Sequence, residues 1–189
     1  MSIFHGRIKA VMVMYLISLY FDDHSTALFD SYQKMIEKQT QQFFLSQKNI
    51  PIHMTLATVH DHDEQVIFDA LNEVISQCRA GIIEMTFIGS FARNTLFLAP
   101  IYNEYLHHLS TVINQQIDTI EGQRKENRYL PFHWQPHITL ARKLDEQQLV
   151  MAFHTLTMLF QPFQTKITRI ALSCTKPYRD LYTWNLEDN

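Results

Sequence analysis

The sequence predicts an α+β protein with two pseudo-symmetric lobes, in which antiparallel sheets have helices packed outside and a central cleft lies between the sheets. Segments with the period of a strand alternate along the chain with segments of helical period. The order strand, helix, strand, helix, strand occurs twice, and one additional strand follows. A short His-x-Thr motif also occurs once in each half. We therefore expect a single domain over residues 1–189, with lobes at approximately 14–91 and 95–186.

An apolar run opens the first predicted lobe and indicates a buried strand at 14–20. The elements predicted after it are a helix from 22 to about 45, a strand at 52–59, a helix from 63 to about 78 and a strand at 83–87. Asp63 is the predicted N-cap of the second helix, and Gly81 is placed at the C′ position that ends it. This lobe therefore contains three strands and two helices.

A turn at Arg93-Asn94 leads into the second predicted lobe. Asp145 and Gln148 have the spacing of a capping box and mark the start of its second helix. The predicted elements are a strand at 95–99, a helix at 105–120, an exposed loop at 121–129, a strand at 135–142, a helix from 145, and strands at 163–174 and 182–186 with a loop at 175–180 between them. The second lobe therefore repeats the first and adds one strand.

Composition and charge argue against several classes of protein. The net charge of −3 and the pI near 6.3 disfavour DNA and long nucleic acids as partners, because non-specific binding to them relies on a broad basic surface. Only two cysteines occur, which indicates a reduced, cytoplasmic protein. The apolar run at 10–21 is shorter than the ~20 residues that span a bilayer, so we expect no membrane association and treat residues 1–12 as a short leader. We expect a monomer.

The repeated motif places one histidine and one threonine in each half. It is written PIHMTLA at residues 51–57 and PHITLAR at residues 136–142. Successive side chains of a strand point to opposite faces, so the histidine and the threonine of each copy share one face. The apolar residues between and after them share the other face. This arrangement predicts a polar face with one histidine from each lobe, above a buried apolar face.

Two histidines that face one another suit phosphodiester chemistry without a metal or another cofactor. A neutral imidazole removes a proton from the attacking hydroxyl or water, and an imidazolium protonates the leaving oxygen. The unperturbed pKa of histidine, ~6.5, makes both forms available near neutral pH. The hydroxyls of Thr55 and Thr139 can donate hydrogen bonds to the non-bridging phosphate oxygens. We therefore predict His53 and His137 as the catalytic pair.

Three further residues are candidates for substrate binding. Arg142 can bind a phosphate group through its guanidinium. Strict alternation along the strand, however, places Lys143 rather than Arg142 on the face of His137. Tyr178 can stack on a nucleobase. The set of predicted substrate ligands is therefore the two threonines, Arg142, Lys143 and Tyr178.

The two His-x-Thr copies resemble the signatures of the two-histidine (2H) phosphoesterase superfamily, in particular its 2′-5′ RNA ligase-like branch with its RNA 2′,3′-cyclic phosphodiesterases. Residues 136–142 are similar to the second signature of that branch, and the similarity extends over about residues 14–186. The resemblance implies the same catalytic pair and the same threonine ligands. It also implies metal-independent hydrolysis of a 2′,3′-cyclic phosphate or a 2′-5′-type phosphodiester in a nucleotide or short RNA. The first motif has few basic residues around it, which disfavours a long RNA substrate.

Three alternatives stay open at this point. A metal-dependent hydrolase is one, since His60 and His62 alternate with Asp61 and Asp63, and imidazoles and carboxylates are proper metal ligands. Their spacing matches no ligand motif, and the segment is equally consistent with a polar loop and a helix N-cap. A non-catalytic module that binds a nucleotide or an RNA end is the second alternative. An RNA-end ligase is the third, although a glycine-rich phosphate loop and an adenylated-lysine motif are both missing.

Overall fold

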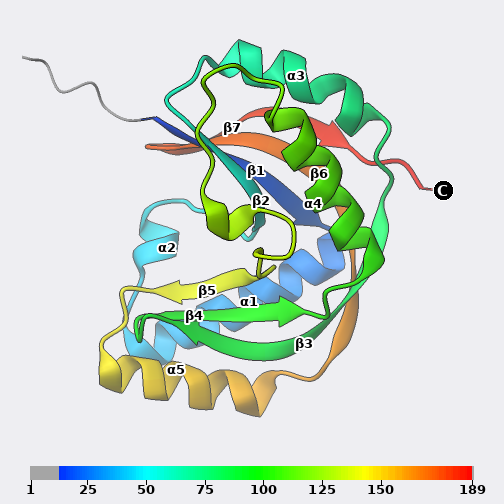
Figure 1. Cartoon of the computed structure of the whole chain (residues 1–189). Coiled ribbons are helices and arrows are strands. Elements are labelled where there is room, and N and C mark those ends of the chain that lie inside the picture. Colours follow the sequence, from blue (N-terminus) through cyan, green and yellow to red (C-terminus); the bar gives the residue numbers. More distant parts are fainter. Residues whose placement is uncertain (1–12, 189) are drawn as a thin grey trace, which may run out of the picture.

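The computed structural model describes residues 13–188, so the leader expected at 1–12 lies outside the described residues (Figure 1). Within them, the predicted strands and helices follow one another in the predicted order, and two short elements that were not predicted are added, α2 and a 3-10 helix. The elements are β1 (Met14–Phe21), α1 (Asp23–Thr40), α2 (Phe44–Gln47), β2 (Met54–His60), α3 (Glu64–Ser76), β3 (Gly81–Phe91), β4 (Thr95–Pro100), α4 (Glu104–Ile117), a 3-10 helix (Asn127–Tyr129), β5 (Ile138–Arg142), α5 (Glu146–Leu159), β6 (Phe163–Thr175) and β7 (Tyr178–Asn185). None of these helices is both long enough and apolar enough to cross a bilayer.

The seven strands form one antiparallel sheet in the order β1-β2-β5-β4-β3-β6-β7, and β6 pairs in addition with β1. The α+β class with antiparallel strands is therefore confirmed. β6 is long enough to serve two groups of strands. Its first part, Phe163–Ile167, pairs with β3, and its second part pairs with β1 on one side and β7 on the other. One group of strands is β5-β4-β3, and the other contains β2, β1 and β7. The two groups are joined at one end by β6, which pairs with β3, β1 and β7, and at the other end by the pairing of β2 with β5.

Each group of strands draws on both halves of the sequence. β3, from the first predicted half, pairs with β4 of the second half, while β7 pairs with the part of β6 beside β1. The helices follow the same rule, because α1 packs against α5 and α3 packs against α4 (Figure 1). The two halves of the sequence therefore have a similar order of strands and helices, but each group of strands in space contains strands from both halves. The two groups are hydrogen-bonded into one sheet.

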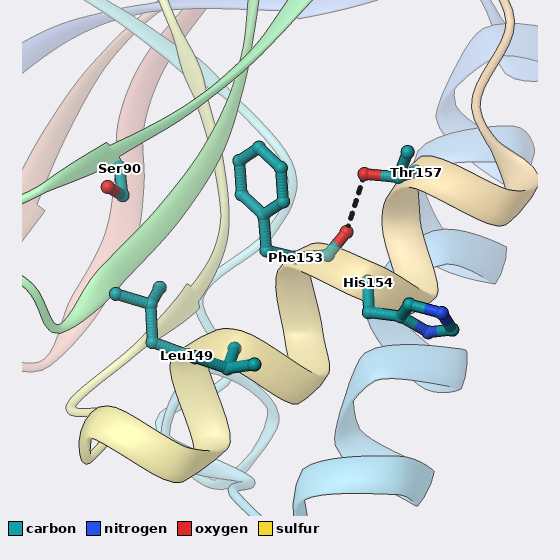
Figure 2. Close-up of a pocket in the computed structure, with 6 residues that line it drawn as sticks. Ser90, Leu149, Phe153, His154 and Thr157 are labelled. Carbon is teal, nitrogen blue, oxygen red and sulfur yellow. Dashed lines mark hydrogen bonds between the residues drawn. The ribbon is translucent and has the colours of Figure 1, made fainter.

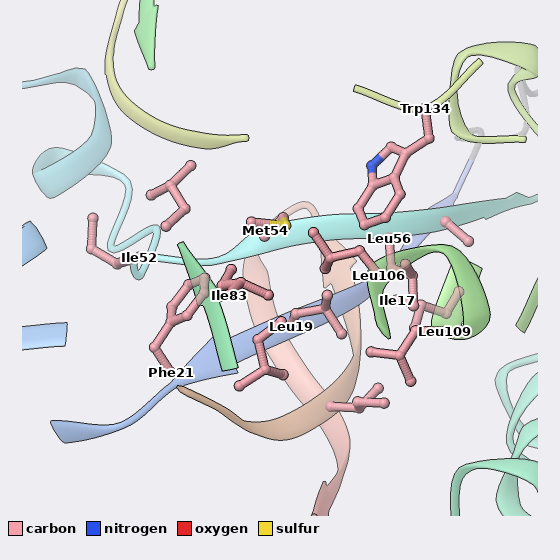
Figure 3. Close-up of a cluster of buried hydrophobic side chains, with 14 of the residues drawn as sticks. Ile17, Leu19, Phe21, Ile52, Met54, Leu56, Ile83, Leu106, Leu109 and Trp134 are labelled. Carbon is pink, nitrogen blue, oxygen red and sulfur yellow. The ribbon is translucent and has the colours of Figure 1, made fainter. Parts of the chain in front are cut away.

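The core beneath the site is apolar and closely packed (Figure 3). Ile17 of β1 and Met54 and Leu56 of β2 are completely buried, and they face Leu106 and Leu109 of α4. Burial of side chains of this size stabilises a fold by roughly 1.5–3 kcal/mol each. Because side chains alternate along a strand, the polar neighbours of these residues point to the other face of the sheet. The core thereby fixes which face carries the site.

Several local predictions are confirmed by hydrogen bonds. The Asp63 side chain accepts from the backbone N–H groups of Gln65 and Val66 as the N-cap of α3. Asp145 and Gln148 form the complete capping box of α5. Local pattern is sufficient here because both partners of each bond lie within one helical turn.

Several predicted boundaries are wrong. The two motif strands begin at Met54 and Ile138 rather than at 52 and 135, so each histidine directly precedes its strand, and the strand predicted at 83–87 extends over 81–91. The first helix ends at Thr40 rather than near 45, because Gln41 takes a left-handed conformation with φ of 56°. Gly81 does not cap α3; it begins β3, where a Cβ atom would lie 2.4 Å from the ring of Tyr105. The predicted loop at 175–180 shortens to a tight turn, because Tyr178 already pairs with Thr175 at the start of β7.

Candidate active site

The two His-x-Thr segments lie next to one another in the sheet. His53 directly precedes β2, and His137 directly precedes β5. β2 and β5 pair antiparallel through Met54 and Ile138, neither of which has exposed surface. Two segments far apart in the sequence are therefore brought together by a single pair of buried residues.

This pairing fixes the relation of the four polar side chains. One residue before Met54, the antiparallel register sets His53 across from Thr139. One residue after Met54, it sets Thr55 across from His137. All four side chains belong to the face opposite the buried pair. The histidines are thus diagonal neighbours, whose Cα atoms are expected roughly 7–8 Å apart.

Both imidazoles are held in the same orientation by the backbone. Nδ1 of His53 lies 2.8 Å from the carbonyl oxygen of Pro51, and Nδ1 of His137 lies 2.8 Å from that of Gln135. A carbonyl oxygen can only accept, so Nδ1 carries the proton in the neutral ring and Nε2 is the nitrogen left free. Each Nε2 can therefore take a proton as a base or donate one as an acid.

The half-buried position of the rings makes both less basic than free histidine. Burial lowers the pKa of His53; the Pro51 carbonyl and the charge of Asp180 oppose this, while His137 and Arg142 add to it. Burial likewise lowers the pKa of His137, which the Gln135 carbonyl opposes and the charges of Arg128 and Arg142 reinforce. The pKa of each ring is therefore below the usual histidine value. The guanidinium of Arg142 acts on both rings, and the carboxylate of Asp180 acts on His53.

Aromatic rings flank each histidine. The ring centroid of Tyr178 lies 5.3 Å from that of His53. Phe91 and Phe97, stacked on each other, lie 4.9 and 5.3 Å from His137. The structure thus places Tyr178 in the site, with its ring against the imidazole of His53.

A β-bulge brings Arg142 to the site and moves Lys143 away from it. Thr139 pairs with Phe97, but Ala141 pairs with Leu96, so Leu140 is an extra residue in β5. The insertion shifts the alternation by one, which returns Arg142 rather than Lys143 to the face of Thr139. The strict alternation assumed for the sequence is therefore wrong at this strand end.

Other contacts agree with this placement of the two cations. The charge of Arg142 acts on His53, His137 and Tyr129, in each case lowering the pKa. The ammonium of Lys143 lies 4.3 Å from the ring centroid of Phe44, on α2, and the guanidinium of Arg142 lies farther from the same centroid, at 6.0 Å. Arg142 is therefore the strand-end cation whose charge faces the paired histidines.

Thr55 and Thr139 are half-buried, and strand alternation puts them on the face of the two histidines. The indole of Trp134, itself buried, donates a 3.0 Å hydrogen bond to the carbonyl oxygen of Thr55 and so fixes the strand at this point. Burial raises the pKa of Tyr129, and the nearby Thr55 side chain opposes that rise. The phenol of Tyr129 therefore belongs to the same cluster as the first threonine.

Sequence reasoning missed Arg128, Tyr129, Tyr20 and Asp180. The first two lie at the end of the segment 121–129, whose polar composition predicted only an exposed loop. Tyr20 is in β1 and Asp180 in β7, far from either motif in sequence. Strand alternation could have placed Tyr20 on the polar face of its strand, but no local signal connects it with His53.

The alternative metal ligands do not converge on one point, and polar neighbours of both histidines lie elsewhere in the chain. Nε2 of His60 lies 3.4 Å from the Glu126 carboxylate, and Nε2 of His62 lies 3.1 Å from the carbonyl oxygen of Glu121. Asp63 caps α3, as described above. Over residues 13–188, no three His, Cys, Asp or Glu side chains converge in a way that could hold a metal ion.

An open groove of about 510 Å³ lies elsewhere on the molecule, between β3 and α5 (Figure 2). The surface that lines the groove is mostly apolar, although Ser90, His154 and Thr157 contribute to it. The Thr157 hydroxyl donates to the carbonyl oxygen of Phe153. None of the predicted site residues lines it. The groove is therefore separate from the paired histidines.

Several solved structures share the fold of this chain. A structure described as a phosphoesterase has 16% sequence identity and a TM-score of 0.58, covering 94% of this chain and 100% of that one. LigT of E. coli in its apo form has 17% identity and a TM-score of 0.55, covering 95% and 100%. TT0787 of Thermus thermophilus has 14% identity and a TM-score of 0.62, covering 93% and 99%. At these identities the likeness establishes the fold.

Sequence comparison with families gives a more specific result. No curated protein matches the chain significantly. The model of the family described as the 2′-5′ RNA ligase superfamily, however, matches residues 22–176, which include both His-x-Thr motifs and most of the sheet. The resemblance seen in the two motifs is thereby confirmed, and the chain belongs to the 2′-5′ RNA ligase superfamily of two-histidine phosphoesterases.

Proposed function

We propose that this protein is a metal-independent phosphoesterase that hydrolyses a 2′,3′-cyclic phosphate or a 2′-5′-type phosphodiester of a nucleotide or short RNA. The observation that carries the proposal is the matched orientation of His53 and His137. Each Nδ1 is bonded to a backbone carbonyl at 2.8 Å, and each Nε2 is left free on the same face of the sheet. This is the arrangement that a base and an acid acting on one phosphorus require.

The reaction follows from these positions. One neutral imidazole takes a proton from water through Nε2, and the water oxygen forms a bond to phosphorus. The bond between phosphorus and the leaving ribose oxygen breaks, and the other imidazolium gives that oxygen its proton. The hydroxyls of Thr55 and Thr139 and the guanidinium of Arg142 donate to the non-bridging oxygens, on which charge accumulates. The ring of Tyr178 offers an aromatic surface on the His53 side for a nucleobase.

The comparisons support a nucleotide as the substrate class. LigT of E. coli has been solved in complex with 3′-AMP. A 3′-nucleotide is the product that results when a 2′,3′-cyclic phosphate opens at its 2′ oxygen. Family membership supports phosphoester chemistry in general, and the proposal adds the hydrolytic direction and the cyclic or 2′-5′ substrate.

A substrate panel in excess chelator tests the proposal. Nucleoside 2′,3′-cyclic phosphates and 2′-5′-linked dinucleotides are incubated with the protein, and products are resolved by ³¹P NMR and chromatography. We expect hydrolysis by the wild-type protein and none above background by His53→Ala or His137→Ala, with the fold of both variants intact by circular dichroism. Activity that disappears in chelator and returns with zinc or manganese would favour the metal-dependent hydrolase.

The same panel separates the remaining alternatives. RNA ends that become joined, with no net hydrolysis, identify a ligase. Binding of a nucleotide by calorimetry without turnover of any substrate identifies a non-catalytic module. Full activity in His53→Ala would contradict the paired-histidine mechanism.

The pH dependence supplies a second test. One histidine must start neutral and the other protonated, so kcat/KM should follow a bell against pH. Because burial lowers the pKa of both rings, the bell should lie on the acidic side of that expected for two free imidazoles. The two limbs belong to the coupled pair rather than to single residues. A profile that is flat from acidic to alkaline pH, with the chemical step rate-limiting, contradicts the mechanism.

A further inference from the structure

A chain of hydroxyl groups connects His53 to a carboxylate. The Tyr178 ring lies against His53, and its hydroxyl oxygen lies 3.1 Å from that of Tyr20. Tyr20 in turn donates a 2.8 Å hydrogen bond to Oδ1 of Asp180. Ser173 donates to the same oxygen at 2.7 Å. Three strands thus contribute: β1 with Tyr20, β6 with Ser173, and β7 with Tyr178 and Asp180.

The proton positions in this chain follow from the carboxylate. A carboxylate can only accept, so the Tyr20 hydroxyl donates its single hydrogen bond to Asp180. The oxygen of Tyr20 can then accept a hydrogen bond from the hydroxyl of Tyr178. The Ser18 hydroxyl, 3.4 Å from the oxygen of Tyr178, is placed to donate in turn. Asp180 therefore determines the direction of the whole chain, and with it the orientation of the ring that packs on His53.

We propose that Asp180 is a positioning residue for His53: through Tyr20 it holds the Tyr178 ring against the imidazole, and it provides a carboxylate on the His53 side of the paired histidines. The inference rests on the proposed function, since it concerns one of the two catalytic histidines. Asp180 itself is exposed, so a carboxylate placed there merely for solubility would need none of these hydroxyl partners. Instead it accepts from two hydroxyls, one of them on the buried Tyr20.

Among the residues that the structure describes, no such chain of hydroxyl groups lies beside the other histidine. The rings that flank His137 are Phe91 and Phe97, which carry no hydroxyl. The charges that act on His137 are those of Arg128 and Arg142. The two halves of the motif are nearly identical in sequence, and Arg142 acts on both histidines. The carboxylate of Asp180 acts in addition on His53, whereas a second guanidinium, that of Arg128, acts on His137.

The groups that face His53 are few enough to test one at a time. They are the phenols of Tyr20 and Tyr178, the carboxylate of Asp180, the imidazole of His137 and the guanidinium of Arg142. Burial, His137 and Arg142 lower the pKa of His53, and Asp180 is the side-chain charge that raises it. The guanidinium of Arg169 lies over the ring of Tyr20, 4.3 Å from its centroid. Arg169 is not mutated in the variants below.

The experiment follows the titration of the His53 imidazole by NMR, in the substrate-free protein, together with the pH profile of kcat/KM. Asp180→Asn keeps an oxygen that accepts from Tyr20 but removes the charge. We expect the pKa of His53 to move down in this variant, and the limb of the profile that His53 governs to move with it. Asp69→Asn, which removes a carboxylate from α3, is the matched control and should leave both unchanged.

Tyr178→Phe separates positioning from charge. It keeps the ring and the carboxylate but cuts the chain between Tyr178 and Tyr20. We expect kcat/KM to fall by about three- to thirtyfold, a part of the ~10²–10⁴ that a general acid or base contributes, while the His53 titration stays close to that of wild type. This variant also covers the case in which Asp180→Asn fails to fold.

Two outcomes would overturn the inference. One is a His53 titration in Asp180→Asn that coincides with those of wild type and Asp69→Asn. The other is a Tyr178→Phe variant with the rate of wild type. The titration is measured without substrate, so it reports on Asp180 even if the protein hydrolyses no phosphodiester at all, and the failure of one proposal can be distinguished from the failure of the other.

Discussion

Replacement of Arg142 by alanine tests the consequence of the bulge in β5. The extra residue Leu140 turns Arg142 to the face of the paired histidines and leaves Lys143 over the ring of Phe44. If Arg142 holds a phosphate oxygen during the reaction, Arg142→Ala should reduce kcat/KM while Lys143→Ala should not. Strict strand alternation predicts the reverse, so the pair of variants decides between the two geometries.

The magnitude follows from the interaction that is lost. A hydrogen bond to a charged group contributes about 1.5–3 kcal/mol, which corresponds to about 10- to 150-fold in kcat/KM. Lys143→Ala removes an exposed cation–π contact of ~0.5 kcal/mol, so we expect a change of less than about threefold. Arg142 also lowers the pKa of both histidines. Its removal should therefore move both limbs of the pH profile to higher pH.

The assay is initial-rate hydrolysis of a nucleoside 2′,3′-cyclic phosphate over a range of pH, with wild type, Arg142→Ala, Arg142→Lys and Lys143→Ala. Arg142→Lys keeps the charge without the two-pronged donor geometry, so its limbs should stay near those of wild type while its rate falls. Two results would refute the reasoning: an Arg142→Ala variant with wild-type rate and limbs, or a Lys143→Ala variant that loses as much activity as Arg142→Ala.

Three further predictions concern the motif and the stability of the fold. Thr55→Ala or Thr139→Ala should lower kcat by about ten- to a thousandfold, as for loss of one donor to developing charge, and alanine at His53 or His137 should cost more; a threonine variant slower than both histidine variants contradicts the assigned roles. Burial lowers the pKa of both histidines, so between the usual pKa of ~6.5 and the lowered pKa the unfolded chain binds more protons than the folded chain. Tm should therefore fall as the pH falls through that window. The fall should be smaller in a variant with glutamine at both positions. Asp22→Ala should lower the free energy of unfolding by about 1–3 kcal/mol in urea titrations, because that carboxylate caps α1 and also accepts from the backbone of β6, whereas Asp22→Asn, which keeps one acceptor oxygen, should lose less.

Local sequence determined the elements of this protein and the identity of its paired motifs. Alternation along residues 51–57 and 136–142 was sufficient to assign His53 and His137 to polar faces, because the period of a strand depends only on its own backbone. The capping box at Asp145 and the N-cap at Asp63 were equally evident, since all their partners lie within a few residues. These features carried the family assignment, which the match over residues 22–176 confirms.

Only the tertiary structure decided how the motifs meet and what surrounds them. The single pair of Met54 and Ile138 joins strands that are distant in sequence, and such register depends on the whole sheet rather than on either strand. The bulge at Leu140 is visible only against the pairing of β5 with β4, and it reverses which basic residue faces the site. The carboxylate of Asp180 in β7 is linked through Tyr20 in β1 to the Tyr178 ring beside His53, and no period in the sequence encodes a contact of that kind. Sequence thus defined the two histidines, and the long-range pairing of strands gave them different electrostatic surroundings.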